Sequence, residues 1–355
     1  MILKETVDVW TRLQKETKPI VMYGTGNGAD KLFCVFQEYG IQVDDIFVSP
    51  EFYRGQTFRD YSCLTYQDIK KKYEDCVIVL AFAIFREDMM TRVKEIAKDY
   101  EVLAPEVPVF GTDYFSIKDL DTYRDEIDRV YDLLADEQSK MVFEDLLNYR
   151  ISGKIEYALH CETPREELFQ NILTLGIEES YLDLGAYRGD TIEEFLSFTE
   201  NSFSAVYALE PDEKNFRKME EYLSTLPGET RSKINCYPYA SWKEKAILSF
   251  DGGGGRNSSL GEGKRTVEAT DLDSLLDGTQ VTYIKMDVEG AEKETLEGLK
   301  HTLKQWQPKL AVSAYHRTGD LFLLPLQIKD LNENYRIYLR HHPYLPAWET
   351  NYYCI

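Results

Sequence analysis

Long apolar runs, paired cysteines and clustered histidines are all missing from this sequence. No segment reaches the roughly 18–20 consecutive apolar residues that cross a bilayer, and the first residues lack the basic, apolar and small-residue segments of a signal peptide. The six cysteines share no CxxC spacing, and the five histidines form no HExxH-type pattern. We therefore expect free thiols, no structural zinc and a cytoplasmic protein without a membrane span.

Positive charge is also scarce, since 41 Lys and Arg stand against 62 Asp and Glu, for a net charge of −21. A charge of this sign opposes non-specific binding to nucleic acid and to anionic membranes. No basic run with interleaved aromatic residues offsets it. The composition therefore disfavours a nucleic-acid substrate, and a homo-oligomeric assembly is compatible with it.

The patterns that are present predict an α/β protein of two domains, in keeping with the length of 355 residues. Short apolar strands, such as those expected at 20–23, 43–48 and 77–83, alternate with helical stripes at both ends of the chain, which is typical of doubly wound sheets. Near the C-terminus we expect a helix over 291–303 and a terminal antiparallel hairpin from residues 335–340 and 352–355. Between them, apolar residues at helical spacing and many acids predict solvated amphipathic helices. We divide the chain into a Rossmann-like domain at 1–115, a helical connector at 116–164 and a second α/β domain at 165–355.

A glycine-rich turn follows the first predicted strand. GTGNGA, residues 24–29, fits the G-x-G-x-x-A pattern that binds a diphosphate at a helix N-terminus. The second strand ends at Ser49 rather than in an acid, so NAD is not favoured. The turn resembles those of sugar-nucleotide-binding domains, and a purely structural turn is the alternative. The candidate nucleotide-binding residues are Gly24, Gly26 and Gly28.

A second turn, in YLDLGAYRGDT, has a different chemistry. Gly185 and Gly189 allow the backbone to bend tightly and to approach a ligand. The flanking carboxylates, Asp183 and Asp190, would repel a diphosphate and suit a cation. Glu210 ends the next strand, about 20 residues later, where an acid captures the ribose hydroxyls of an adenosine. A positively charged adenosine without a phosphate is S-adenosylmethionine.

Six segments resemble FkbM-type methyltransferases in order and spacing over residues 165–355: YLDLGAYRGDT, ALEPDEKNF, YASWKEKAILSF, TDLDSLL, IKMDVEGAE and AYHRTGDL. The resemblance implies a class I methyltransferase sheet, S-adenosylmethionine as donor and transfer to a hydroxyl oxygen, commonly of sugars or polyketide-type products. We assign donor binding to Asp183, Gly185, Ala186, Tyr187, Gly189, Asp190, Glu210, Pro211, Ala240, Trp242 and Asp287.

The acceptor side is predicted where two further strands end. In the family's sheet, the strand of VTYIKMDVEG lies beside the first strand, so Asp287 and Glu289 should face the donor. They would orient the hydroxyl, offset the sulfonium charge or hold a divalent metal, which the pattern leaves undecided. His316 follows the next strand and is the expected catalytic base, with Asp287 as the competing candidate. The alternative is that Glu289 caps a helix and Asp287 fixes a loop.

These patterns predict an O-methyltransferase that acts on a carbohydrate, nucleotide-sugar or glycoconjugate. Two other readings stay open: a methyltransferase of a non-sugar small molecule, and a non-catalytic nucleotide-binding module. The glycine-rich stretch DGGGGRNSSLGEG, residues 251–263, is expected to be a mobile lid or a simple connection.

Overall fold

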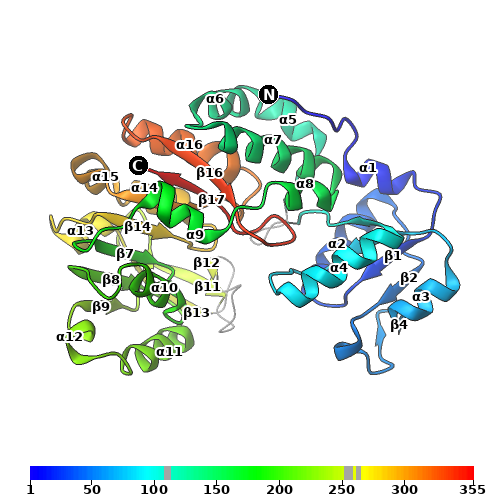
Figure 1. Cartoon of the computed structure of the whole chain (residues 1–355), viewed down its shortest axis with the longest axis horizontal. Coiled ribbons are helices and arrows are strands. Elements are labelled where there is room, and N and C mark those ends of the chain that lie inside the picture. The colour runs from blue at the N-terminus through cyan, green and yellow to red at the C-terminus, as the bar shows by residue number, and fades with distance from the viewer. Residues whose placement is uncertain (108–112, 252–258, 261–264) are drawn as a thin grey trace.

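The computed structural model describes residues 1–107, 113–251, 259–260 and 265–355. Most of the glycine-rich stretch at 251–263 therefore lies outside the described residues. Two α/β units stand on opposite sides of the molecule in Figure 1, and a row of helices runs along the top between them. None of the helices in the described parts of the chain is long and apolar enough to cross a membrane.

The first unit is a six-stranded sheet of order β3-β4-β2-β1-β5-β6. All neighbouring strands are parallel except the β3-β4 hairpin. The strands β1, β2 and β5 were predicted, whereas the short β3, β4 and β6 carry too few apolar residues to stand out. The strands are β1 (Ile20–Tyr23), β2 (Asp45–Phe47), β3 (Thr57–Phe58), β4 (Tyr61–Leu64), β5 (Val77–Leu80) and β6 (Glu101–Leu103). The helices are α1 (Val9–Gln14), α2 (Asn27–Tyr39), α3 (Tyr66–Lys72) and α4 (Glu87–Asp99), with a 3-10 turn, η1, at Pro50–Phe52.

The second unit contains a seven-stranded sheet of order β16-β17-β15-β14-β7-β8-β9. Only β17 runs antiparallel to its neighbours, so the predicted terminal hairpin and the predicted pairing of the fourth strand with the first are confirmed. The doubly wound α/β fold is therefore confirmed. Its strands are β7 (Ser180–Leu184), β8 (Ala205–Leu209), β9 (Ile234–Tyr237), β14 (Tyr283–Met286), β15 (Lys309–Ser313), β16 (Ile337–His341) and β17 (Thr350–Cys354).

Further elements flank this sheet. Among the described residues, a small second sheet consists of β10 (Ala240–Ser241), β11 (Ala246–Asp251), β12 (Ser259–Leu260) and β13 (Arg265–Thr270). The helices are α9 (Arg165–Leu168), α10 (Asp190–Phe198), α11 (Glu213–Leu223), α12 (Gly228–Arg231), α13 (Leu272–Leu276), α14 (Glu292–Glu297), α15 (Lys300–Trp306) and α16 (Asp320–Leu331), with a π-helical turn, η2, at Phe169–Leu173.

One helix expected over residues 291–303 is two helices, α14 and α15. The break falls at Gly298, where an added Cβ would lie 2.1 Å from the carbonyl oxygen of Trp242. The backbone of another segment therefore approaches the helix at a distance that only glycine permits. Helical periodicity continues through this contact, which is why the sequence pattern did not reveal the break.

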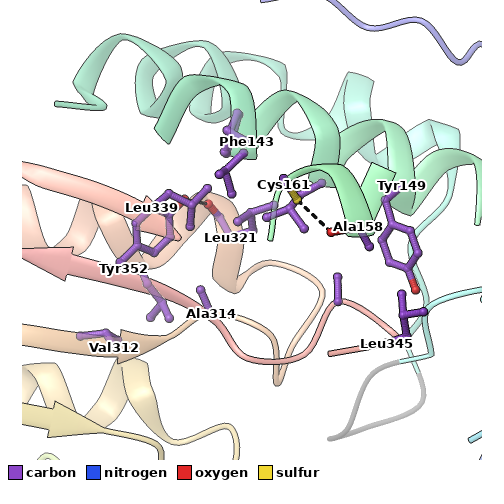
Figure 2. Close-up of a cluster of buried hydrophobic side chains, with 14 of the residues drawn as sticks. Phe143, Tyr149, Ala158, Cys161, Val312, Ala314, Leu321, Leu339, Leu345 and Tyr352 are labelled. Atoms are coloured by element: carbon purple, nitrogen blue, oxygen red, sulfur yellow. Dashed lines mark hydrogen bonds between the residues drawn. The ribbon is translucent and has the colours of Figure 1, made fainter. Parts of the chain in front are cut away.

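The connecting helices are α5 (Ile117–Thr122), α6 (Arg124–Leu133), α7 (Glu137–Ser152) and α8 (Ile155–His160). The short α6 is amphipathic, but α7 is buried over most of its length rather than solvated. Figure 2 shows Phe143 of α7 and Cys161 at the end of α8 in one cluster with Val312 and Tyr352 of the seven-stranded sheet. The connecting helices are thus part of the core of the second unit.

Buried polar contacts tie these helices to both units. The Arg150 guanidinium on α7 forms an ion pair with Glu106, at 2.8 Å from Nε to Oε2, and Nη1 donates to the carbonyl of Thr318 at 3.0 Å. Both side chains of the ion pair are buried. Ile84 and Leu345 form an antiparallel bridge between the units, with backbone hydrogen bonds of 2.6 and 2.9 Å.

We expect Arg150→Met to lower the free energy of unfolding by about 3–5 kcal/mol, because it leaves the Glu106 carboxylate buried without its partner. Urea denaturation at neutral pH measures the loss. Arg124→Met is the matched control, since Arg124 and Asp121 form an exposed pair, and we expect no measurable change there. Equal effects of the two substitutions would contradict a structural role for the buried pair.

Candidate active site

The turn after β7 is held by two glycines in the left-handed region. Gly185 has φ +79°, and an added Cβ would lie 1.9 Å from the carbonyl oxygen of Asp287. Gly189 has φ +88°, precedes α10 and packs against the Tyr222 ring. Side chains at either position would force the turn away from its neighbours. The turns after β7 and β14 therefore touch through their backbones.

A cavity of about 490 Å³ opens at the carboxyl ends of β7, β8, β14 and β15. This is the edge of an open α/β sheet where ligands bind, beside the point at which the strand order reverses. The predicted donor-site residues that line the cavity are Gly185, Tyr187, Asp190, Glu210, Pro211, Ala240 and Asp287.

The other predicted donor-site residues lie around the cavity. Asp183 is fully buried beneath it, and Ala186 and Gly189 shape the turn. Trp242 lies elsewhere, with its carbonyl against Gly298. An aromatic side chain that the cavity does include at this end is Tyr239.

Glu210 is buried beside the turn. Its Oε2 accepts from the backbone N–H of Tyr187 and its Oε1 from that of Asp212, each at 2.8 Å. Burial raises the pKa of Glu210 to about 7, although both backbone donors act in the opposite direction. Each carboxylate oxygen keeps a further lone pair toward the cavity, as the capture of two ribose hydroxyls requires.

The floor of the cavity holds an acid and a lysine on adjacent strands. Asp183 Oδ2 accepts from the Thr191 hydroxyl at 2.5 Å, whereas Oδ1 has no hydrogen-bond partner among the described residues. The Lys285 ammonium lies 3.9 Å from that Oδ1 and donates to the carbonyl of Gly185 at 3.1 Å. Burial raises the pKa of Asp183 to about 6 against the opposing charge of Lys285.

Two basic residues of the cavity wall were not predicted. Lys285 was overlooked because it lies within an apolar strand. A lysine in a buried strand nevertheless indicates a buried charge partner, since lysine is rarely buried without one. Arg165 of α9 forms a bidentate pair with Glu194, at 2.7 Å for both contacts, and lies 3.4 Å from Glu349. No motif marks Arg165, because these partners come from distant parts of the chain.

The predicted acceptor residues meet at one corner of the cavity. Asp287 and Glu289 line it, while His316 lies fully buried behind them. The imidazole Nε2 is 3.3 Å from Asp287 Oδ1 and 3.5 Å from Glu289 Oε2. The other nitrogen, Nδ1, is 2.8 Å from Oε1 of Glu292, a residue that sequence reasoning did not select.

The charges of this corner are strongly coupled. Burial would lower the pKa of His316, but the carboxylates of Glu292 and Glu289 raise it to about 10. Burial raises the pKa of Glu289 to about 8. Burial also opposes ionisation of Asp287, yet the charges of Lys285 and His316 hold its pKa below the ordinary value. Asp287 is thus the ionised group at the cavity surface, and His316 is held as an imidazolium in the protein alone.

The predicted nucleotide turn of the first unit is also tightly packed. An added Cβ at Gly24, which has φ +114°, would lie 2.6 Å from the Phe82 ring. At Gly28 it would lie 2.4 Å from the Ala81 carbonyl, whereas Gly26, which precedes α2, has open space around it. The glycines let this turn pack on the segment that follows β5.

Comparison with known proteins agrees with the fold. Residues 183–345 match the family model of the methyltransferase FkbM domain. The chain is similar to the methyltransferase FkbM of Methylobacillus flagellatus, with a TM-score of 0.75 and 20% identity over 96% of this chain and 90% of that one. An rRNA methylase of Streptococcus thermophilus has a TM-score of 0.36 and 12% identity over 54% of this chain and 96% of that one. No curated protein matches the chain.

We expect Glu210→Ala to weaken the binding of S-adenosylhomocysteine at least tenfold, because a charge-assisted hydrogen bond contributes about 1.5–3 kcal/mol. Isothermal titration calorimetry measures the change. Glu213→Ala is the control, since Glu213 is exposed at the start of α11 just beyond Glu210. Unchanged binding by the Glu210 variant would remove Glu210 from the donor site.

The raised pKa of Glu210 also predicts a pH dependence. The ionised carboxylate is the stronger acceptor, because protonation turns one of its oxygens into a donor, and its ionised fraction falls by about tenfold between pH 8 and pH 6 when the pKa is about 7. Affinity for S-adenosylhomocysteine should therefore fall as the pH falls through 7. Glu210→Gln removes the titrating group, so its weaker binding should show a flatter profile. Parallel profiles for the two proteins would assign the titration to another group.

Proposed function

We propose that this chain, an S-adenosylmethionine-dependent methyltransferase with an FkbM domain at residues 183–345, transfers the methyl group to a hydroxyl of a carbohydrate, nucleotide-sugar or glycoconjugate. The observation that carries the proposal is the cavity itself. One continuous space is lined by the donor turn at Gly185, by the acids Asp287 and Glu289, and by an aromatic residue of the first unit, Phe85.

The residues of the cavity fit a cationic adenosine. Glu210 lines the cavity where an adenosine ribose would lie, and Gly185 keeps the turn close to Asp287. Asp183 is buried beneath the cavity, with Oδ1 3.9 Å from the Lys285 ammonium, and adds negative charge behind the site without lining it. When bound, S-adenosylmethionine supplies an electrophilic methyl group on a sulfonium.

Asp287 is the proposed proton acceptor of the transfer. It is ionised, lines the cavity and receives a hydrogen bond from the Tyr315 hydroxyl at 3.1 Å. The acceptor oxygen forms the new bond to the methyl carbon as the carbon–sulfur bond breaks, with its electron pair left on sulfur. The hydroxyl proton passes to Asp287. Lys285, 3.6 Å from Asp287 Oδ2, keeps the carboxylate ionised until the transfer.

The aromatic end of the cavity is proposed to bind the acceptor. The rings of Phe85 and Tyr344 stack at 5.8 Å between centroids, and Tyr344 contacts the Trp348 ring at 5.9 Å. Aromatic faces beside carboxylates suit a sugar, which presents apolar ring faces and polar hydroxyls. A flat natural product with a hydroxyl would use the same surface, so trial acceptors of both classes decide between them.

The nucleotide turn of the first unit packs on the chain segment that leads to Phe85 at this cavity. Gly28 packs on Ala81 and Gly24 on Phe82, and the same segment continues to Phe85 at the cavity wall. A nucleotide-sugar with its diphosphate at Gly24, Gly26 and Gly28 would therefore extend toward the methyl-transfer site.

All six cysteines are unpaired, which supports a reducing, cytoplasmic setting.

We expect Phe85→Ala to raise the KM for the acceptor by about two- to twelvefold, because an aromatic contact contributes roughly 0.5–1.5 kcal/mol, while donor affinity stays unchanged. The measurement is methyl transfer from S-adenosylmethionine to a panel of nucleotide-sugars, free sugars and phenolic compounds. Phe52→Ala is the control, as Phe52 is similarly exposed on the first unit. Transfer only to phenolic compounds would overturn the carbohydrate assignment, and an unchanged KM would remove Phe85 from the acceptor site.

A further inference from the structure

His316 has one ring nitrogen whose role the proposed methyl transfer leaves unexplained. Glu292 Oε1 accepts from the backbone N–H of Val288 at 3.0 Å and is 2.8 Å from His316 Nδ1. A carboxylate on Nδ1 fixes one proton there, so a cation that displaces the second proton of the metal-free imidazolium would find Nε2 as a lone-pair donor. Nε2 is fully buried and has no hydrogen-bond partner among the described residues. It points to the corner where Asp287 and Glu289 meet the cavity.

The carboxylates around Nε2 are similarly incomplete. Glu289 Oε2 lies 3.5 Å from Nε2 and has no hydrogen-bond partner within the described parts of the chain. Asp287 Oδ1 lies 3.3 Å from Nε2 and accepts from the Tyr315 hydroxyl, which leaves it one more lone pair. Two carboxylate oxygens from different residues thus lie within 3.5 Å of Nε2, and the three atoms become electron-pair donors once Nε2 gives up its proton.

The backbone is bent to bring Glu289 to this point. Glu289 has φ +52° and Gly290 has φ +93°, so two consecutive residues occupy the left-handed region. For a residue other than glycine this conformation costs about 1–2 kcal/mol. Strain at a non-glycine residue is typical of a functional position. A side chain that only capped the following helix would not require this left-handed backbone conformation.

The separations are those of ligands on a common cation. Metal–nitrogen and metal–oxygen bonds are about 2.1 Å long for the smaller divalent ions. Two such ligands lie about 3.0 Å apart in octahedral geometry and about 3.4 Å apart in tetrahedral geometry, by the bond lengths just given. The distances of 3.3 and 3.5 Å from Nε2 fall beside these values. Asp287, Glu292 and His316 also offer donor atoms within 4.8 Å of one another.

We propose that Asp287, Glu289 and His316 bind a divalent transition-metal ion. Glu292 is the outer partner that orients the imidazole, an arrangement that recurs at histidine-bound metals. Two carboxylate oxygens and one imidazole nitrogen suit Mn²⁺, Fe²⁺, Co²⁺ or Zn²⁺ better than Ca²⁺ or Mg²⁺, which prefer oxygen alone. Lys285 approaches Asp287 from its other oxygen, at 3.6 Å from Oδ2, and leaves Oδ1 to the cation.

The site has a use that rests on the proposed methyl transfer. Asp287 and Glu289 belong to the cavity wall, whereas His316 lies behind them. The remaining coordination positions of the cation would therefore face the cavity, where an acceptor hydroxyl could become a ligand. A coordinated hydroxyl is held in place and loses its proton more readily. The cation would also balance the carboxylates that Lys285 alone does not neutralise.

The test uses Mn²⁺ alone, titrated into the chelator-treated full-length protein without donor or acceptor. The loss of the free-ion electron paramagnetic resonance signal reports binding. We expect a single site in the wild type and at least tenfold weaker binding in His316→Ala and in Glu289→Gln. His301→Ala and Glu294→Gln are the matched controls, because His301 is exposed and Glu294 lies on the next helix outside the corner. Both controls should bind as the wild type does.

A thermal unfolding series provides the second readout. Mn²⁺ should raise the midpoint of the wild type and of the controls, but not that of the two variants. Titration of S-adenosylhomocysteine into each variant shows that the fold and the donor site survive, and separates a failed metal site from a failed methyltransferase assignment. If His316→Ala does not fold, Glu289→Gln decides, since its side chain faces the cavity. Absence of binding by Mn²⁺, Co²⁺ and Zn²⁺ to the wild type, or equal binding by the variants, overturns the proposal.

Discussion

The contact between the turn at Gly185 and the carbonyl oxygen of Asp287 is the constraint on which the site depends. It exists because β7 and β14 pair in register, with Asp183 opposite Lys285, and because Gly185 carries no side chain. The donor turn and the acceptor loop are therefore one backbone unit. A change that separated the two strands would therefore disturb the turn beside Glu210 and the loop that carries Asp287 at the same time.

Charge is the second constraint, and it follows from the first. Bringing two strand ends together places the buried Asp183 near Asp287 and Glu289, which line the cavity. Buried carboxylates are costly unless they are paired. Lys285 lies between Asp183 and Asp287, at 3.9 and 3.6 Å, and offsets part of that cost. The negative charge that Lys285 does not neutralise attracts cations, and both a sulfonium and a divalent ion would meet this requirement.

The sequence predicted those parts of the site that local pattern encodes. Glu210 follows a strand at a fixed spacing from the glycine turn, and in the structure it accepts from the backbone N–H of Tyr187. Lys285 and Arg165 escaped prediction because their partners are brought near only by the folded sheet. Trp242 was selected for its aromatic ring, yet its position is decided by backbone packing on Gly298. Local spacing thus identifies strand ends, whereas tertiary contacts decide which side chains face the cavity.

The connecting helices explain how a residue of the first unit can belong to the cavity of the second. The buried α7 packs on the seven-stranded sheet of the second unit through Phe143. Its Tyr149 hydroxyl donates to the carbonyl of Ala104 at 2.6 Å, at the end of β6 in the first unit. The same helix therefore holds both sheets. The bridge between Ile84 and Leu345 then sets Phe85 against Tyr344. A solvated linker would not fix the two units relative to each other, so the burial of α7 is a condition for Phe85 to line the same cavity as Tyr344.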